Sequence, residues 1–101
     1  MNRENQGKAQ MHKLHEFGDA LLELVNVQME GAKKYPNVGK MPNWLIPPAH
    51  EENSFFDSAL RHIHQYLQGQ KLDEETGCDH RAHAAWNLLA AMRHYPIAEQ
   101  K

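Results

Sequence analysis

Residues 54–90 read SFFDSALRHIHQYLQGQKLDEETGCDHRAHAAWNLLA, and this stretch decides the fold. It contains two runs in which apolar residues recur at helical spacing, separated by the turn-like segment 69–77. The apolar positions of the first run are Phe56, Ala59, Leu60, Ile63 and Leu67, and those of the second are Ala82, Ala85, Trp86, Leu89 and Met92. A short connection between two helices favours an antiparallel pair.

The ends of both helices carry their own signals. Ser54, followed three residues later by Asp57, resembles a capping box and predicts the start of the first helix. Gly69 suits the position just after a helix C-terminus. Asp79 predicts the N-cap of the second helix, and Pro96 ends it.

The residues before this stretch predict a third helix and a long loop. Apolar residues recur at helical spacing over residues 12–34 at Leu14, Phe17, Leu21, Leu24, Val25 and Ala32. Residues 35–53 contain four of the five prolines, which excludes a regular helix or a central strand. The prediction is an all-α fold, a small bundle of three main helices. The proline-rich loop joins the helix of residues 12–34 to the helix that starts at Ser54. A short fourth helix in the forties, or oligomerisation, would complete the bundle.

Composition limits the classes of function. With 101 residues the chain suits one domain, expected over residues 11–101 after a flexible polar arm at 1–10. A net charge of −2 argues against binding to a nucleic-acid backbone. The longest mostly apolar run, residues 20–27, is too short to cross a membrane, and the single Cys78 cannot form an internal disulfide. We therefore expect a cytoplasmic protein that binds neither nucleic acids nor membranes.

Histidines and carboxylates near the second helix suggest a metal site. His80, His83 and Asn87 stand at i, i+3 and i+7, so they share one ridge. Asp73 and Glu74 lie in the preceding loop, which an antiparallel pair brings to the same end. Histidine with carboxylate suits a divalent cation, and carboxylates beside phosphates suit Mg²⁺ or Mn²⁺.

Arg61 on the first helix is a candidate phosphate ligand because a guanidinium can bind phosphate through two hydrogen bonds, and Lys34 adds positive charge. The alternative interpretation is structural. Asp57 would cap the helix and pair with Arg61, and the histidines would form buried hydrogen bonds.

Two other groups are less specific. Asn43 and Trp44, after Lys34 and Tyr35, could recognise a nucleobase by stacking and amide hydrogen bonds, or Trp44 could fill the core beneath the loop. The second group consists of His12, His15, Glu16 and Asp19. Its E-x-x-D spacing is typical of Mg²⁺-binding carboxylate pairs, and also of any solvent-facing helix.

Three stretches together resemble a known family: GAKKYP (31–36), NW (43–44) and FFDSALRHIHQYLQGQKLDEETGCDHRAHAAWNLL (55–89). The order and spacing are similar to those of the phage-encoded family described as the dATP/dGTP diphosphohydrolase N-terminal domain. The matching positions are Lys34, Tyr35, Asn43, Trp44, Asp57, Arg61, His62, Gly69, Asp73, Gly77, His80 and His83. The related MazG-like pyrophosphohydrolases carry paired E-x-x-E and E-x-x-D motifs, of which only the Glu16/Asp19 spacing is present here.

The resemblance implies a helical hydrolase of purine deoxynucleoside triphosphates that uses a divalent metal and releases pyrophosphate and a monophosphate. The carboxylates favour Mg²⁺ or Mn²⁺ as this cofactor. A homo-oligomer is expected because two three-helix units can complete one bundle. The predicted catalytic residues are Arg61, His62 and His83. The predicted substrate-binding residues are Lys34, Tyr35, Asn43, Trp44, Arg61 and Asn87, and the predicted metal ligands are Asp73, Glu74, His80 and His83. The alternatives are a phage module that binds or sequesters a nucleotide without cleaving it, and an inhibitor of a host protein.

Overall fold

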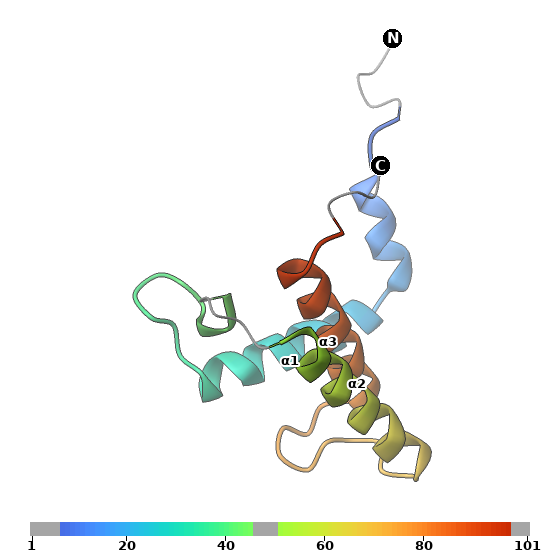
Figure 1. Ribbon diagram of the computed structural model, residues 1–101. Coiled ribbons are helices and arrows are strands. Elements are labelled where there is room, and N and C mark those ends of the chain that lie inside the picture. Colours follow the sequence, from blue (N-terminus) through green and yellow to red (C-terminus); the bar gives the residue numbers. More distant parts are fainter. Residues whose placement is uncertain (1–6, 46–50, 98–101) are drawn as a thin grey trace.

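The computed structural model describes residues 7–45 and 51–97. Within them the chain forms three α-helices and two short 3₁₀ helices, with no strand (Figure 1). In chain order these are η1 (Met11–Phe17), α1 (Ala20–Lys34), η2 (Asn43–Leu45), α2 (Glu52–Leu67) and α3 (His80–His94). The all-α prediction is confirmed, and η2 is the short helical segment expected in the forties. Residues 1–6 of the predicted arm lie outside the described residues.

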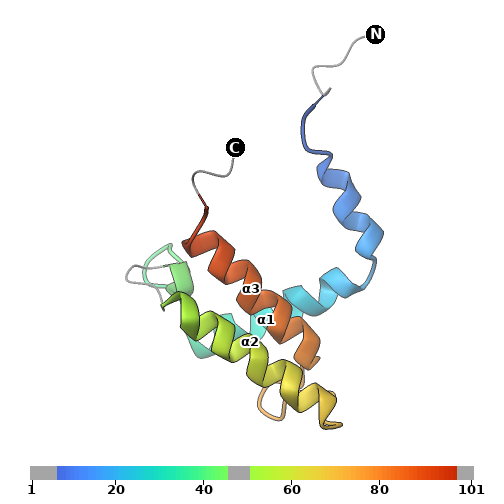
Figure 2. The same cartoon turned by 45° about the vertical axis from the view of Figure 1, so that its right-hand side comes forward.

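Helices α2 and α3 form an antiparallel hairpin, and α1 crosses behind it in the view of Figure 2. An isolated bridge between Leu72 and Asp79 closes the base of the hairpin. There the amide of His80 donates to the carbonyl of Lys71 at 3.0 Å, and the amide of Asp73 donates to the carbonyl of Cys78 at 2.8 Å. These bonds hold the loop of residues 73–77 against the start of α3.

The first predicted helix is corrected by the structure. Residues 12–34 do not form one helix, because Gly18 takes a φ of +61° and interrupts it between η1 and α1. A backbone of that conformation cannot continue a right-handed helix, and glycine adopts it at little cost.

Three of the four predicted helix ends are confirmed. Helix α3 ends at His94, two residues before Pro96. Gly69 follows α2 with a φ of +100°, and the Asp79 side chain accepts a hydrogen bond from the Arg81 amide as the N-cap of α3. The capping box at Ser54 is wrong, since α2 begins at Glu52 with Glu51 as its N-cap. The Ser54 amide already donates to the Glu51 carbonyl at 2.9 Å, so Ser54 lies within the first turn.

The core is small and uses other faces than those predicted. The buried apolar residues are Val27, Phe55, Ala59, Cys78, Ala82, Ala84, Ala90 and Ala91. Of the predicted apolar stripes only Ala59 and Ala82 are buried, whereas Leu60 and Leu67 are 62% and 75% exposed. Helix α2 instead turns Phe55 and Ala59 toward α3, where small alanines allow close approach. Periodicity identified the apolar stripes but not the sides on which the helices meet.

Candidate functional site

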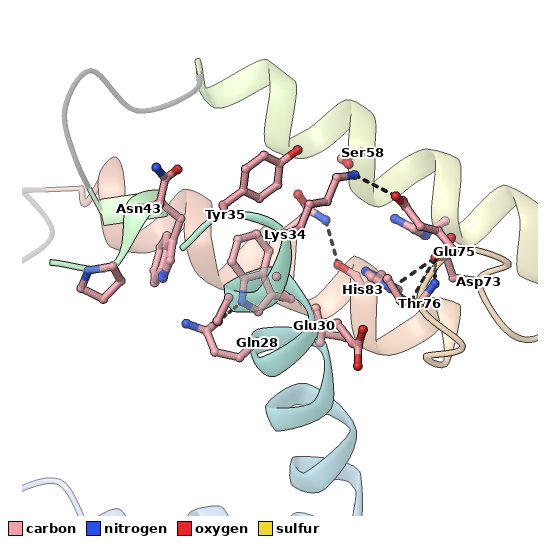
Figure 3. A pocket seen from close by; sticks show the side chains of 18 of the residues that line it. Gln28, Glu30, Lys34, Tyr35, Asn43, Ser58, Asp73, Glu75, Thr76 and His83 are labelled. Carbon is pink, nitrogen blue, oxygen red and sulfur yellow. Dashed lines mark hydrogen bonds and ion pairs between the residues drawn. The ribbon is translucent and has the colours of Figure 1, made fainter. Parts of the chain in front are cut away.

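A cavity of about 510 Å³ lies between the C-terminal part of α1, η2 and one side of the α2/α3 hairpin (Figure 3). Asp73, Glu75, Thr76 and His83 gather at one end of it, and Asn43 lies toward the other. Nine of the residues predicted for the site line this cavity: Lys34, Tyr35, Asn43, Trp44, Arg61, His62, Asp73, His83 and Asn87. Their assigned roles remain predictions. Of the other two, Glu74 is exposed and outside the lining, and His80 is fully buried behind it.

Three histidines form a cluster at the acidic end of the cavity. The Nδ1 atoms of His62 and His80 are 2.8 Å apart, so one ring donates to the other. The rings of His62 and His83 stack in parallel, with centroids 4.4 Å apart. His80 is completely buried, and its Nε2 has no hydrogen-bond partner among the described residues. A buried ring nitrogen without a partner is costly in a folded protein unless something else satisfies it.

Thr76 connects the loop to this cluster. Its hydroxyl lies 3.0 Å from the Asp73 carboxylate, to which it donates, and 2.8 Å from Nε2 of His83. The same oxygen accepts a hydrogen bond from the Cys78 amide at 3.1 Å. Because the single hydroxyl proton goes to Asp73, we assign the proton shared with His83 to Nε2. In that tautomer Nδ1 of His83 keeps its lone pair.

The electrostatics of the cluster favour neutral rings at His62 and His83 beside an ionised Asp73. Burial, reinforced by repulsion from His83 and His80, lowers the pKa of His62 to about 4. Burial likewise lowers the pKa of His83. For Asp73, burial alone would raise the pKa, but the two hydrogen bonds from Thr76 and the nearby histidines outweigh it and lower the pKa.

The donor atoms of His62, Asp73 and His80 all lie within 4.8 Å of one another and could hold a metal ion. All three residues belong to the predicted sets, His62 as a catalytic residue and Asp73 and His80 as metal ligands. The hairpin brings His62 of α2 and His80 of α3 together with Asp73 of the connecting loop. The donors are two imidazole nitrogens and one carboxylate oxygen, a set that suits divalent first-row transition metals, Mn²⁺ among them. Glu74 and His83 are not in this group.

Two cations line the cavity beyond the histidines. The Lys34 ammonium pairs with Glu75 at 3.0 Å across 41 positions of sequence, and its hydrogen bond to Glu75 raises the pKa of Lys34. Nη2 of Arg61 lies 3.4 Å from the Ser58 hydroxyl, to which it donates. The alternative in which Arg61 pairs with Asp57 therefore does not describe the side chain seen here.

The opposite wall is aromatic. Trp44 packs edge-on against Trp86, with ring centroids 5.3 Å apart, and against His94 at 5.4 Å. It therefore both covers the core near Phe55 and lines the cavity, so the two interpretations of Trp44 are compatible. The Nε1 atom of Trp44 is buried and has no hydrogen-bond partner among the described residues.

Several lining residues were missed by the sequence reasoning: Gln28, Glu30, Ser58, Glu75, Thr76 and Trp86. Thr76 had a signal, because it precedes Gly77 within the DEETG segment that carries the resemblance. Glu75 lies in the same segment, next to the predicted ligand Glu74. Gln28, Glu30, Ser58 and Trp86 carried no signal that separates them from other helix residues.

The carboxylates near the N-terminus lie elsewhere. Glu16 in η1 and Asp19 are exposed and separated by the break at Gly18, and Glu16 pairs with Lys13 at 3.6 Å. Neither lines the cavity. The E-x-x-D spacing is therefore not presented by one continuous helix.

The family model described as dATP/dGTP diphosphohydrolase, N-terminal, matches residues 1–101, the full length of the sequence. The chain belongs to this family. No curated protein and no solved structure matches it. Within the described part of this family member, no helix is long and apolar enough to cross a membrane.

Proposed function

We propose that this chain is a metal-dependent hydrolase of purine deoxynucleoside triphosphates, releasing pyrophosphate and a nucleoside monophosphate. One observation carries the proposal. A single cavity is lined at one end by His62 and Asp73, two members of a metal-type donor set whose third member, His80, lies buried behind them. The same cavity has two cationic side chains on its walls and aromatic surfaces toward the other end. Its volume of about 510 Å³ is within the usual range of small-molecule sites, roughly 300–1,000 Å³.

The donor set favours Mn²⁺ or another first-row divalent metal over Mg²⁺. His62 and Asp73 have the protonation states that ligands need at pH 7, a neutral ring and an ionised carboxylate. Mg²⁺ prefers oxygen ligands, whereas imidazole nitrogen suits transition metals. The position of His80 also fits a metal ligand. Its Nε2 has no hydrogen-bond partner among the described residues and its Nδ1 contacts His62, and rotation of the ring can present either nitrogen to an ion. A bound cation would neutralise phosphate charge and lower the pKa of an attacking water.

In this proposal, Arg61 and Lys34 bind the phosphates. Among the described residues, Arg61 has only a long hydrogen bond to Ser58, so its guanidinium has unused donors for phosphate oxygens. Lys34 can exchange its contact with Glu75 for a phosphate. His83, neutral and held by Thr76, retains Nδ1 as an atom that can accept a proton.

In this proposal, the base binds beside Tyr35 and Asn43. Tyr35 is exposed on the cavity wall and offers a ring face, and the amide of Asn43 lies next to it in the same lining. Stacking with amide hydrogen bonds is suited to purine recognition.

The test is pyrophosphate release from each of the four deoxynucleoside triphosphates with Mg²⁺, Mn²⁺ or Co²⁺. We expect wild type to cleave dATP and dGTP fastest with Mn²⁺ or Co²⁺, and Asp73→Asn to lose at least about 100-fold, since it loses a ligand of the metal. Asp19→Asn, which alters a carboxylate outside the cavity, is the matched control and should retain full rate.

Absence of pyrophosphate with every triphosphate and metal would overturn the proposal. Calorimetric titration with dATP and dGTP in EDTA then identifies the other candidate. Tight binding without a metal and without turnover is the behaviour of a nucleotide-sequestering module.

A further inference from the structure

The side of the hairpin that faces away from the cavity carries a continuous apolar surface, the back face. It consists of Phe56, Leu60, Ile63 and Leu67 of α2 with Leu88 and Met92 of α3, all of them exposed. These are the strongest apolar positions of α2, where periodicity predicted a buried stripe. Nothing in the described chain covers them.

Helical geometry places this surface opposite the cavity. On α2, Ser58 and Arg61 line the cavity, and Leu60 and Ile63 follow each of them by two residues. Two residues correspond to about 200° around a helix, so these side chains leave from the far side. On α3 the same offset separates Leu88 from Trp86, which lines the cavity. Figure 2 shows α2 and α3 side by side with α1 behind them, which leaves their other side uncovered.

The exposed area of the back face approaches what a stable interface needs. Its six side chains are between 37% and 75% exposed, and together they expose on the order of 600 Å², against about 800 Å² per partner in an interface of standard size. A contiguous apolar patch larger than about 400 Å² marks an interaction site on a soluble protein.

The core is correspondingly small for an independent fold. Five of its eight buried apolar residues are alanines, and Phe55 is its largest side chain. Alanine burial contributes little hydrophobic free energy, so the larger apolar side chains that would stabilise the fold lie on the back face instead.

We propose that the back face is the interface of a homodimer, in which a second copy of this chain docks its own α2 and α3 there by twofold symmetry. A twofold interface brings the same patch of both subunits together, and a flat, two-helix apolar layer is self-complementary in that way. The product is a four-helix bundle, one hairpin from each subunit. The two cavities then face outward, and each stays open to solvent. This inference does not depend on the proposed function.

Sedimentation equilibrium measures the assembly directly. Wild type is expected at twice the mass of the chain at micromolar concentration. Leu60→Glu, which places a charge in the interface, should raise the dissociation constant at least about 100-fold. Leu22→Glu is the matched control and should stay dimeric, because Leu22 is 58% exposed on α1 and belongs to neither the back face nor the cavity.

Cross-linking gives an answer even if Leu60→Glu fails to fold. Leu60→Cys treated with a short bismaleimide should yield a covalent dimer, whereas Leu22→Cys should not; the native Cys78 is buried. A wild type that is monomeric up to about 100 μM overturns the proposal and assigns the back face to another occupant. A dimer that survives Leu60→Glu without a Leu60→Cys cross-link also overturns it, by placing the interface elsewhere.

Discussion

The imidazole rings of His62 and His83 lie face to face, with centroids 4.4 Å apart and planes 7° from parallel. Two protonated rings at that separation would repel each other, so the stack excludes a charge on both. Burial lowers the pKa of both histidines and favours neutral rings at the cavity wall. The same neutrality leaves ring nitrogens with lone pairs beside the ionised Asp73. Uncharged imidazoles therefore favour both the stacking of the two rings and metal binding by His62.

Thr76 is expected to be essential for both the loop and the site. Thr76→Val removes the hydroxyl that bonds to Asp73, His83 and the Cys78 amide. The His83 ring and the Cys78 amide lose this partner, and Asp73 keeps only the hydrogen bond from the backbone amide of residue 76. We expect a loss of about 1–3 kcal/mol in the free energy of unfolding, measured with urea, and loss of pyrophosphate release. Thr76→Ser keeps the hydroxyl and should behave almost as wild type. Equal damage from both variants would show that the methyl group, not the network, matters.

Removing the partner of Lys34 is expected to strengthen nucleotide binding. Glu75→Gln frees the Lys34 ammonium and removes a negative charge near the phosphates, so the KM for dATP and dGTP should fall several-fold. Stability should change by less than about 1 kcal/mol, because the pair is exposed. Lys34→Met should raise KM. A higher KM for Glu75→Gln would contradict this account and place Glu75 among the groups that hold the ligand.

Tyr35 is expected to contribute to binding and not to folding. Its side chain is 54% exposed on the cavity wall, so Tyr35→Ala should leave the urea midpoint unchanged while losing base stacking worth about 1–3 kcal/mol, or 5- to 150-fold in affinity. Met41→Ala, in the same loop but outside the cavity, is the control. Unchanged affinity in Tyr35→Ala would remove this ring from the base site.

Metal-free protein should lose stability as the pH falls. The folded pKa of His62 is about 4, below its ordinary value of 6.5, so the unfolded chain binds a proton first on acidification. This contribution is fully present above pH 6.5 and is lost progressively between pH 6.5 and about 4. Urea midpoints of EDTA-treated protein at pH 7.5, 6 and 5 measure it. His62→Gln should show a weaker dependence, with the remainder from His83, whose pKa is also lowered; an identical slope would refute the assignment.

Much of the site was accessible from the sequence because residue type and order carry its chemistry. Lys34, Asn43 and Arg61 are far apart in sequence, but their residue types suit phosphate and base recognition, and the family resemblance includes all three. His80 was expected as a ligand, but its complete burial and its contact with His62 depend on how closely two helices pack. No local pattern encodes that distance.

The helices themselves were predicted with less success where packing decides. Asp79 and Gly69 mark helix ends through local hydrogen bonding and backbone conformation, and both were found as expected. Gly18 broke the first helix through a positive φ that the apolar repeat does not reveal. Leu60 lies on the most regular apolar stripe and is nonetheless exposed in the single chain. An apolar stripe indicates that a helix face is covered, but it does not indicate which element, or which copy of the chain, covers it.

The most direct test of the site is a crystal structure of the protein with Mn²⁺ and the non-hydrolysable analogue deoxyguanosine 5′-(α,β-imido)triphosphate, with anomalous scattering used to locate the metal. The account predicts a manganese peak between His62, Asp73 and His80, the triphosphate against Arg61 and Lys34, and the base beside Tyr35 and Trp44. A nucleotide bound elsewhere, or a manganese ion away from His62 and Asp73 while the nucleotide is present, would contradict it.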